Sequence, residues 1–431
     1  MEITALPYLR PAMVLACSLA AAFSSPVIAG SLDVVPAERV GMSSERLDKL
    51  TRQLQQAVDD GTAPGFQVVV ARRGQVVLHE SIGVADLDSG RPVTDETLYR
   101  IYSMTKPVVA TAMLVLYEEG KYSLSDPLSK YIPEFTDVKV YAGADDDGKP
   151  ILAEPARPPQ IRDLFQHTAG LTYGFFSNTP VDKLYLEAEF WKADNLQQAI
   201  AALAGMPLLF DPGTAYHYSY ASDVQGRLIE VLSGMPVEDF IKSRVLEPLG
   251  MDETMTWAAG ENAALLSRVH TLDSDGELTV YRDQPDTAIP VDSAYEPPRA
   301  FSGGAQLIST ADDYWRFAQM LLNGGSLEGE RILSPKTAKM MTTSRLPEAV
   351  PGRSSGPGTG YGFNLDIVDD ETVFNYPVSN GEFSHGGYAT THFWVDPEQE
   401  LVVVVLNQYL PYSNPQYVDL VHRLVHSAIM N

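Results

Sequence analysis

Two kinds of apolar spacing occur near the N-terminus of the chain. After Ser43, a residue type that often caps helices, apolar residues recur at helical spacing. These residues are Leu47, Leu50, Leu54 and Val58. Two short apolar runs, Phe66–Ala71 and Val76–Glu80, then flank a turn at Arg72–Gln75 and predict a hairpin. The start of the chain therefore predicts a helix followed by antiparallel strands.

The C-terminal end shows the same patterns in reverse order. Apolar runs at Thr391–Val395 and Leu401–Leu406 flank a turn at Asp396–Gln399, and a last helix is expected over Tyr417–Met430. Strands near both ends favour a single antiparallel sheet to which both ends contribute. We expect its strands within about residues 36–130 and 300–431.

Helical spacing dominates the middle of the chain, about residues 131–299. Helices are expected at Asn195–Leu203 and Ser222–Leu232, and another at Ala311–Leu322 after this region. No internal repeat or linker separates independent domains. We predict an α/β (α+β) fold: an antiparallel sheet from both chain ends, flanked by helices and interrupted by an all-helical insertion.

A long apolar run follows a serine–lysine pair. Val108–Glu119 predicts a buried helix that ends at Gly120. Pro107 is tolerated only in the first helical turn, so the helix begins close to Ser103. Ser103 and Lys106 then lie at positions i and i+3, where a nucleophile and a base can meet. Because Lys106 precedes a proline, its surroundings must hold it in helical conformation. The spacing is common by chance, but a polar pair at the mouth of a buried helix suggests a function.

The first 29 residues predict a cleaved signal peptide. Arg10 precedes a short apolar region, Ala12–Phe23, and a small-x-small pattern ends at Ala29. The only cysteine, Cys17, ends a stretch that resembles a lipoprotein box, but the apolar region continues past it. Cleavage after Ala29 is therefore favoured over lipidation, and we expect a periplasmic or secreted protein.

Composition narrows the chemistry of the expected single domain, residues 30–431. Without Cys17, this domain has no thiol for disulfides, thiolate catalysis or zinc–thiolate sites. No run of 18 apolar residues follows the leader, so no membrane anchor is expected in the mature chain. The formal net charge of −25 argues against nucleic acid or an anionic membrane as partner. The acidic run Asp145–Asp147 has no EF-hand spacing and is expected to be a solvated loop. We expect no cofactor and no metal; the sequence does not indicate the oligomeric state.

Two further motifs combine aromatic residues with glycine. In the segment Asp211–Tyr220, a Pro-Gly turn leads into an aromatic cluster. The segment Phe383–Tyr388 contains two adjacent glycines just before a predicted strand. Such glycines allow a backbone to approach a ligand closely.

Together these motifs resemble the serine hydrolases of the penicillin-binding-protein and class C β-lactamase superfamily, and within it the esterases of bacterial lipolytic family VIII. The resemblance covers roughly residues 38–430 and implies a β-lactamase/transpeptidase-like fold. The matching segments, in chain order, are Tyr102–Pro107, Gln166–Leu171, Tyr218–Tyr220, Ser302–Ala305, Ser309–Asp313 and Phe393–Pro397.

The resemblance implies a role for each matching residue of the predicted site. Ser103 would be the acylated nucleophile, and Lys106 and Tyr218 would share the general-base role. The backbone N–H groups of Ser103 and Tyr388 would form the oxyanion hole. A buried lysine, or a tyrosine beside a cation, has a pKa below its usual value near ~10, so either can take the serine proton. The sequence does not decide between them.

Two departures from the β-lactamase motifs bear on the substrate. Tyr220 stands where those enzymes have Asn, and His385, Gly386 and Gly387 stand where they have Lys-Thr-Gly. The missing Asn and Lys would contact the lactam amide and carboxylate, so the resemblance implies a small-molecule ester, or an amide, as substrate. The candidates for the oxyanion hole and for substrate binding are Tyr220, His385, Gly386, Gly387 and Tyr388. We expect a secreted carboxylesterase acting on short-chain or aryl esters. A β-lactamase, a D-Ala-D-Ala carboxypeptidase or D-aminopeptidase-like enzyme, and a non-turnover penicillin-binding-like sensor are the alternatives.

Another serine motif is less convincing. Gly352–Gly356 matches the G-x-S-x-G nucleophile elbow, and Asp366 and His385 follow in the expected order. The elbow needs a buried strand before it and a helix after it, whereas proline and glycine flank it here on both sides. Ser354 is therefore not expected to be the nucleophile. His167 is expected to be a structural hydrogen bonder.

Overall fold

The computed structural model describes residues 1, 32–188, 190–284, 290–347, 350, 356–411 and 416–431. The predicted signal peptide, apart from Met1, lies outside these residues, and so does Cys17. Ser354 of the G-x-S-x-G match also lies outside them. In the part of the chain that is described, no helix has the length and apolar character needed to cross a membrane.

A large antiparallel sheet joins the two ends of the chain. Eight of the described strands form it in the order β12-β13-β14-β15-β16-β1-β2-β3. Their bounds are β1 Gly65–Arg72, β2 Gln75–Asp86, β3 Arg91–Pro92, β12 Thr359–Tyr361, β13 Asp366–Val368, β14 Phe383–Gly387, β15 Thr391–Asp396 and β16 Leu401–Leu406. The two ends meet where β1 pairs with β16, with Val69 opposite Val404. The expected fold class is confirmed.

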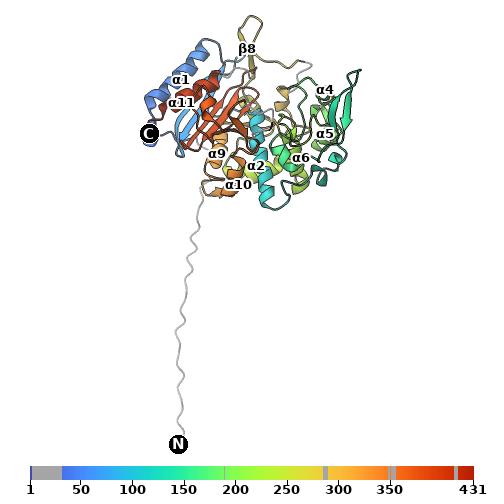
Figure 1. Cartoon of the computed structure of the whole chain (residues 1–431). Coiled ribbons are helices and arrows are strands. Elements are labelled where there is room, and N and C mark those ends of the chain that lie inside the picture. Colours follow the sequence, from blue (N-terminus) through green and yellow to red (C-terminus); the bar gives the residue numbers. More distant parts are fainter. Residues whose placement is uncertain (2–31, 189, 285–289, 348–349, 351–355, 412–415) are drawn as a thin grey trace. The chain divides into compact units, whose positions relative to one another are not determined.

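Helices cover both faces of the sheet. Because side chains alternate along a strand, Val68 and Val70 pack on one face while Val69 packs on the other. Helices α1 (Ser44–Asp59) and α11 (Gln416–Ala428) lie side by side on the Val68 face (Figure 1). The Val69 face packs against α9 (Ala311–Leu322) and, within the same core, α2 (Thr105–Glu118).

Side-chain caps are present at two of these helices, and the cap at Ser43 is the one that the sequence predicts. Ser43 Oγ accepts a hydrogen bond from the backbone N–H of Arg46 at the start of α1. Thr310 Oγ1 accepts one from the backbone N–H of Asp313 at the start of α9. Each cap satisfies a backbone donor that the first helical turn leaves without a partner.

Helices form the second part of the structure, around α2. The remaining helices are α3 Ile161–Phe165, α4 Pro180–Glu187, α5 Leu196–Ala204, α6 Ala221–Ser233, α7 Val237–Ile241, α8 Glu261–Leu265 and α10 Pro335–Met341. Helix α2 packs against α6, and its residues from Thr105 to Leu116 are all buried. It is thus the buried central helix that the sequence predicts.

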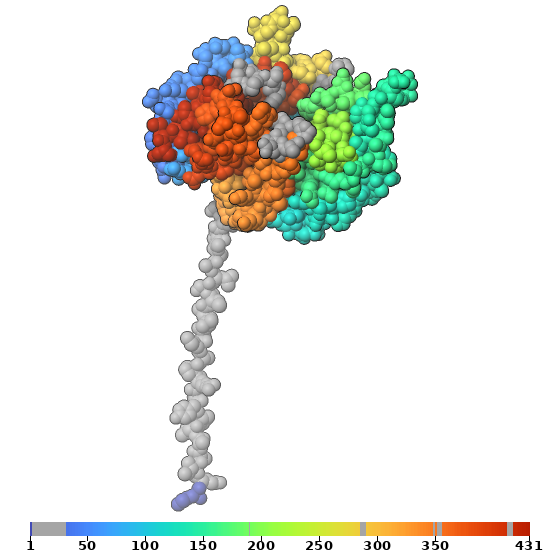
Figure 2. Space-filling model, viewed as in Figure 1, coloured from blue at the N-terminus to red at the C-terminus, as the bar shows by residue number. Residues whose placement is uncertain are grey.

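The expectation that the insertion is all-helical is wrong. It also contains two small hairpins, β5 (Val140–Ala144) with β6 (Pro150–Ala153) and β7 (His270–Leu272) with β8 (Leu278–Val280). Both turns contain Asp-Gly, a strong hairpin signal. The acidic run beginning at Asp145 forms the first turn, as the solvated loop expected. The second hairpin projects from the surface (Figure 2).

The helix layer on the Val68 face provides a test of the packing. Leu50 of α1 is fully buried, so Leu50→Ala should lower the free energy of unfolding by about 2–5 kcal/mol. Leu152 of β6 is 47% exposed, and Leu152→Ala should change that energy by less than about 0.5 kcal/mol. Chemical denaturation of both variants checks this. Equal effects would contradict the placement of α1.

Candidate active site

Ser103 lies at a sharp bend between the strand β4 (Tyr99–Arg100) and the helix α2. It belongs to a short 3-10 turn, Tyr102–Met104, that leads directly into the helix. Tyr102 has a φ angle of 43°, a left-handed conformation that is uncommon outside glycine. Pro107 is the third residue of α2, so the helix begins close to Ser103, as predicted. This strained bend leaves Ser103 only partly buried at the mouth of the helix.

Lys106 reaches Ser103 from the first turn of α2. Its Nζ lies 3.1 Å from Ser103 Oγ and donates a hydrogen bond of 2.8 Å to the backbone oxygen of Gly304. The side chain is only 1% exposed. Burial disfavours the charged form and lowers the pKa of Lys106 to about 7, although Asp223 opposes this shift. The amine can therefore accept a proton near neutral pH.

Asp223, on α6, is a site residue that the sequence analysis missed. Its Oδ1 accepts hydrogen bonds from Ser302 Oγ at 2.6 Å and from the backbone N–H of Gly304 at 3.3 Å. A Cβ atom on Gly304 would lie 3.0 Å from Asp223 Oδ2 and 3.3 Å from Lys106 Nζ, so glycine leaves room for these groups. Burial raises the pKa of Asp223, while Ser302 and Lys106 lower it. The available signal was a carboxylate on the buried face of a predicted helix.

Tyr218 is brought to the same place by the loop before α6. Its ring centroid lies 4.4 Å from Lys106 Nζ. The ring of His167 packs 4.7 Å from it, and His167 Nδ1 accepts a hydrogen bond from the backbone N–H of Ser219. Burial holds the pKa of His167 well below its usual value. His167 is thus a neutral hydrogen bonder that holds the Tyr218 loop, as expected.

Strand β14 approaches Ser103 from the sheet. A Cβ atom on Gly387 would lie 2.4 Å from the backbone oxygen of Ile101, so only glycine fits between strand and bend. The ring of Tyr388 packs edge-on against that of Tyr102, with centroids 5.7 Å apart. The backbone at Tyr388 therefore lies beside the bend that carries Ser103, where the expected oxyanion hole would form.

His385 of β14 is buried and faces the lysine. Its Nδ1 donates a hydrogen bond of 2.7 Å to the backbone oxygen of Gly386, which leaves Nε2 without a proton in the neutral ring. Burial, with the nearby charge of Lys106, lowers the pKa of His385 to about 3. His385 is therefore neutral and does not supply the positive charge of the lysine it replaces.

Aromatic side chains form the wall behind Tyr218. Tyr220 is buried, and its ring packs 4.4 Å from that of Tyr173 and 4.8 Å from that of Phe190. Its ring contacts with Tyr173 and Phe190 are packing contacts in this wall, and a contact of Tyr220 with substrate stays a prediction. The ring of Phe176, 57% exposed, packs edge-on against Tyr218 at 5.7 Å. Tyr173 and Phe176 were not predicted, although they stand close together in a loop rich in aromatic residues.

The chain matches proteins of one family along most of its length. A family model described as Beta-lactamase matches residues 49–425. An uncharacterized protein of Mycobacterium tuberculosis is 34% identical over 376 residues, which cover 85% of this chain and 90% of that protein. Esterase EstB of Burkholderia gladioli is 29% identical over 392 residues, which cover 86% of this chain and 93% of that esterase. The solved structure of EstCE1, a hydrolase with promiscuous acyltransferase activity, superposes with a TM-score of 0.76 at 28% identity. The match covers 89% of this chain and 99% of EstCE1. The chain belongs to the beta-lactamase family and is a serine hydrolase.

Proposed function

We propose that this serine hydrolase is a carboxylesterase that cleaves short-chain or aryl esters through an acyl-enzyme on Ser103. The observation that carries the proposal is the position of Lys106, buried and 3.1 Å from the Ser103 hydroxyl. A free serine is a poor nucleophile and needs an adjacent base. An amine with a lowered pKa at hydrogen-bond distance meets that need.

The reaction proceeds in two half-reactions. Ser103 Oγ attacks the ester carbonyl, and its proton passes to Lys106 or Tyr218. The backbone N–H groups of Ser103 and Tyr388 stabilise the oxyanion, each by roughly 3 kcal/mol of barrier. Collapse breaks the C–O bond to the alcohol, which leaves with the proton. Lys106 or Tyr218 then deprotonates a water molecule, which attacks the acyl-enzyme. This step releases the acid and restores the Ser103 hydroxyl.

Charge at the site favours neutral esters over β-lactams. A lactam antibiotic carries a carboxylate, and the neutral His385 offers no positive charge where β-lactamases have a lysine. The exposed aromatic rings of Phe175 and Phe176 lie beside Tyr173 and Tyr218, and such a wall suits apolar or aryl groups. The names of EstB and EstCE1 are in keeping with ester hydrolysis.

We further propose that residues 1–29 direct export and are removed, which leaves a periplasmic or secreted enzyme. The support is the sequence pattern alone: Arg10, the apolar region and Ala29.

Ester hydrolysis should depend on Ser103. We expect Ser103→Ala to lower kcat/KM for p-nitrophenyl acetate and butyrate by at least about 10³-fold, because it removes the nucleophile. Ser243→Ala, at an exposed serine on the surface, should leave this rate unchanged. Full activity in Ser103→Ala would refute the assignment.

Assays with other substrates, together with intact mass spectrometry, separate the esterase from the alternative functions. Turnover of nitrocefin or of a D-Ala-D-Ala peptide above that of the esters would overturn the esterase proposal. A long-lived adduct on Ser103 in intact mass spectrometry, without turnover, would identify a sensor instead. Rapid ester turnover with no accumulated adduct supports the esterase.

Catalysis should follow the protonation of Lys106. Below a pH of about 7 the amine is charged and cannot accept the serine proton, so kcat/KM should fall about tenfold per pH unit. Asp223→Asn removes a charge that raises the pKa of Lys106. The pH below which kcat/KM falls should therefore be lower in this variant. The control is Asp313→Asn, another buried carboxylate, whose hydroxyl partner is Thr254. A pH profile that does not move in Asp223→Asn, or moves equally in the control, contradicts the role of Asp223.

Export should leave a defined N-terminus. We expect the intact mass of protein recovered from the periplasm or medium to correspond to a chain that begins at Gly30. A lipid-modified chain beginning at Cys17 would show membrane attachment instead. A full-length chain confined to the cytoplasm would refute export.

A further inference from the structure

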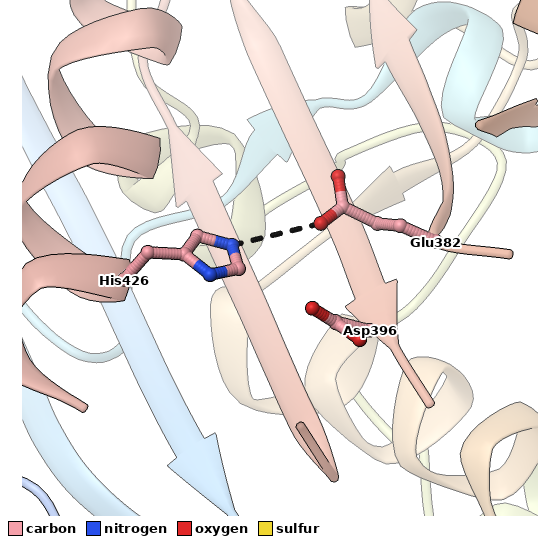
Figure 3. Close-up of side chains that lie close together, drawn as sticks. All are labelled: Glu382, Asp396 and His426. Carbon is pink, nitrogen blue, oxygen red and sulfur yellow. Dashed lines mark ion pairs between the residues drawn. The ribbon is translucent and has the colours of Figure 1, made fainter. Parts of the chain in front are cut away.

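A second group of chemically active side chains lies on the other face of the sheet. Glu382 directly precedes β14, and Asp396 is the last residue of β15. Because strand residues alternate, Glu382 points away from the face that His385 occupies and toward α11. His422 and His426 stand one turn apart on that helix, so both can face the sheet. Figure 3 shows Glu382, Asp396 and His426 converging between helix and sheet.

The contacts within this cluster are incomplete. His422 Nε2 lies 3.2 Å from Glu382 Oε1, whereas His426 Nε2 lies 3.6 Å from Glu382 Oε2. The second distance is too long for a hydrogen bond. Both atoms are buried, and neither has a hydrogen-bond partner among the described residues. The two side chains are only 8% and 4% exposed, so an uncompensated polar atom on either is costly.

Asp396 brings a second carboxylate to the same place. Its Oδ1 accepts hydrogen bonds from the backbone N–H groups of Glu398 and Gln399, and its Oδ2 accepts one from Ser379 Oγ at 2.7 Å. A carboxylate oxygen has a further lone pair beyond such a bond. A cation between two buried carboxylates whose oxygens lie within 4.8 Å of each other would stabilise both.

The spacing of these atoms suits a metal ion. One atom each of Glu382, Asp396 and His426 lie within 4.8 Å of one another. Ligands at about 2.0–2.1 Å from a tetrahedral ion are about 3.3 Å apart. The 3.6 Å between His426 and Glu382 needs little adjustment, whereas the longest separation in the set, up to 4.8 Å, must shorten when the ion binds. One nitrogen and two oxygen ligands match the preferences of Zn²⁺. An adjoining cavity of about 200 Å³, lined in part by Glu382 and His422, leaves room for water as a fourth ligand.

We propose that Glu382, Asp396 and His426 bind a zinc ion, with His422 orienting Glu382 by its hydrogen bond. The ion connects the start of β14 and the end of β15 to α11. It lies on the face of the sheet opposite Ser103, so it stabilises the fold and takes no part in the chemistry. The proposal does not depend on ester hydrolysis.

Zinc binding by untagged protein, stripped with a chelator, tests the proposal. Titration calorimetry should show one Zn²⁺ per chain, and the ion should raise Tm while Mg²⁺ does not. Co²⁺ in place of Zn²⁺ should give visible absorption bands of a low-coordinate nitrogen–oxygen site.

Variants locate the site. Glu382→Gln and His426→Gln should each weaken zinc binding at least about tenfold. His79→Gln is the matched control, because His79 forms another buried histidine–carboxylate pair, 2.9 Å from Asp312, and should leave binding unchanged. Circular dichroism confirms that each variant is folded.

If a variant does not fold, the zinc titration of the stripped wild-type protein by itself tests the proposed site. Absence of stoichiometric zinc binding by the stripped wild-type protein overturns the proposal. Affinity that is unchanged in both Glu382→Gln and His426→Gln overturns it as well.

Discussion

The removal of Lys106 from water is the constraint on which the rest of the site depends. An exposed lysine would be protonated at neutral pH and could not act as a base. Helix α2 provides the necessary burial, because all its residues from Thr105 to Leu116 lie in the core. The Gly304 carbonyl accepts a hydrogen bond from the amine, and the charge of Asp223 raises the pKa of Lys106 only part of the way back toward its usual value. In the proposed mechanism, the free energy of burying this amine sets the pH at which Ser103 can react.

Strand β14 and Glu382, which directly precedes it, contribute side chains to both faces of the sheet. On one face, His385 and Gly387 approach the bend that carries Ser103. On the other, Glu382 meets the histidines of α11. The alternation of side chains along a strand makes this division unavoidable. Interactions that hold the start of β14 therefore also hold the edge on which the expected oxyanion hole depends.

Much of the architecture could be predicted because its signals are local. Apolar patterns identified α1, α2, α9, α11 and the strands β1, β2, β15 and β16, and Ser43 and Thr310 cap their helices. They did not identify the shorter strands β3, β12, β13 and β14. The hairpins β5–β6 and β7–β8 were missed because helical stretches nearby dominated the interpretation, although Asp-Gly marks both turns. Periodicity carries no information about how far apart in space two segments lie.

The sequence by itself determined the helix and hairpin at the start of the chain, the last hairpin and helix, the start of α2 close to Ser103, and the residue types available at three motifs. The preference for esters over lactams stays a prediction, which rests on Tyr220 and His385 at the places where the resemblance expects Asn and Lys. Only the tertiary structure decided that Asp223 lies across Gly304 from Lys106 and that His385 is neutral. Both depend on burial and on contacts between residues more than 80 positions apart, as the Asp223–Gly304 hydrogen bond shows. A pKa depends on the surroundings that folding creates, which residue types and spacing do not specify.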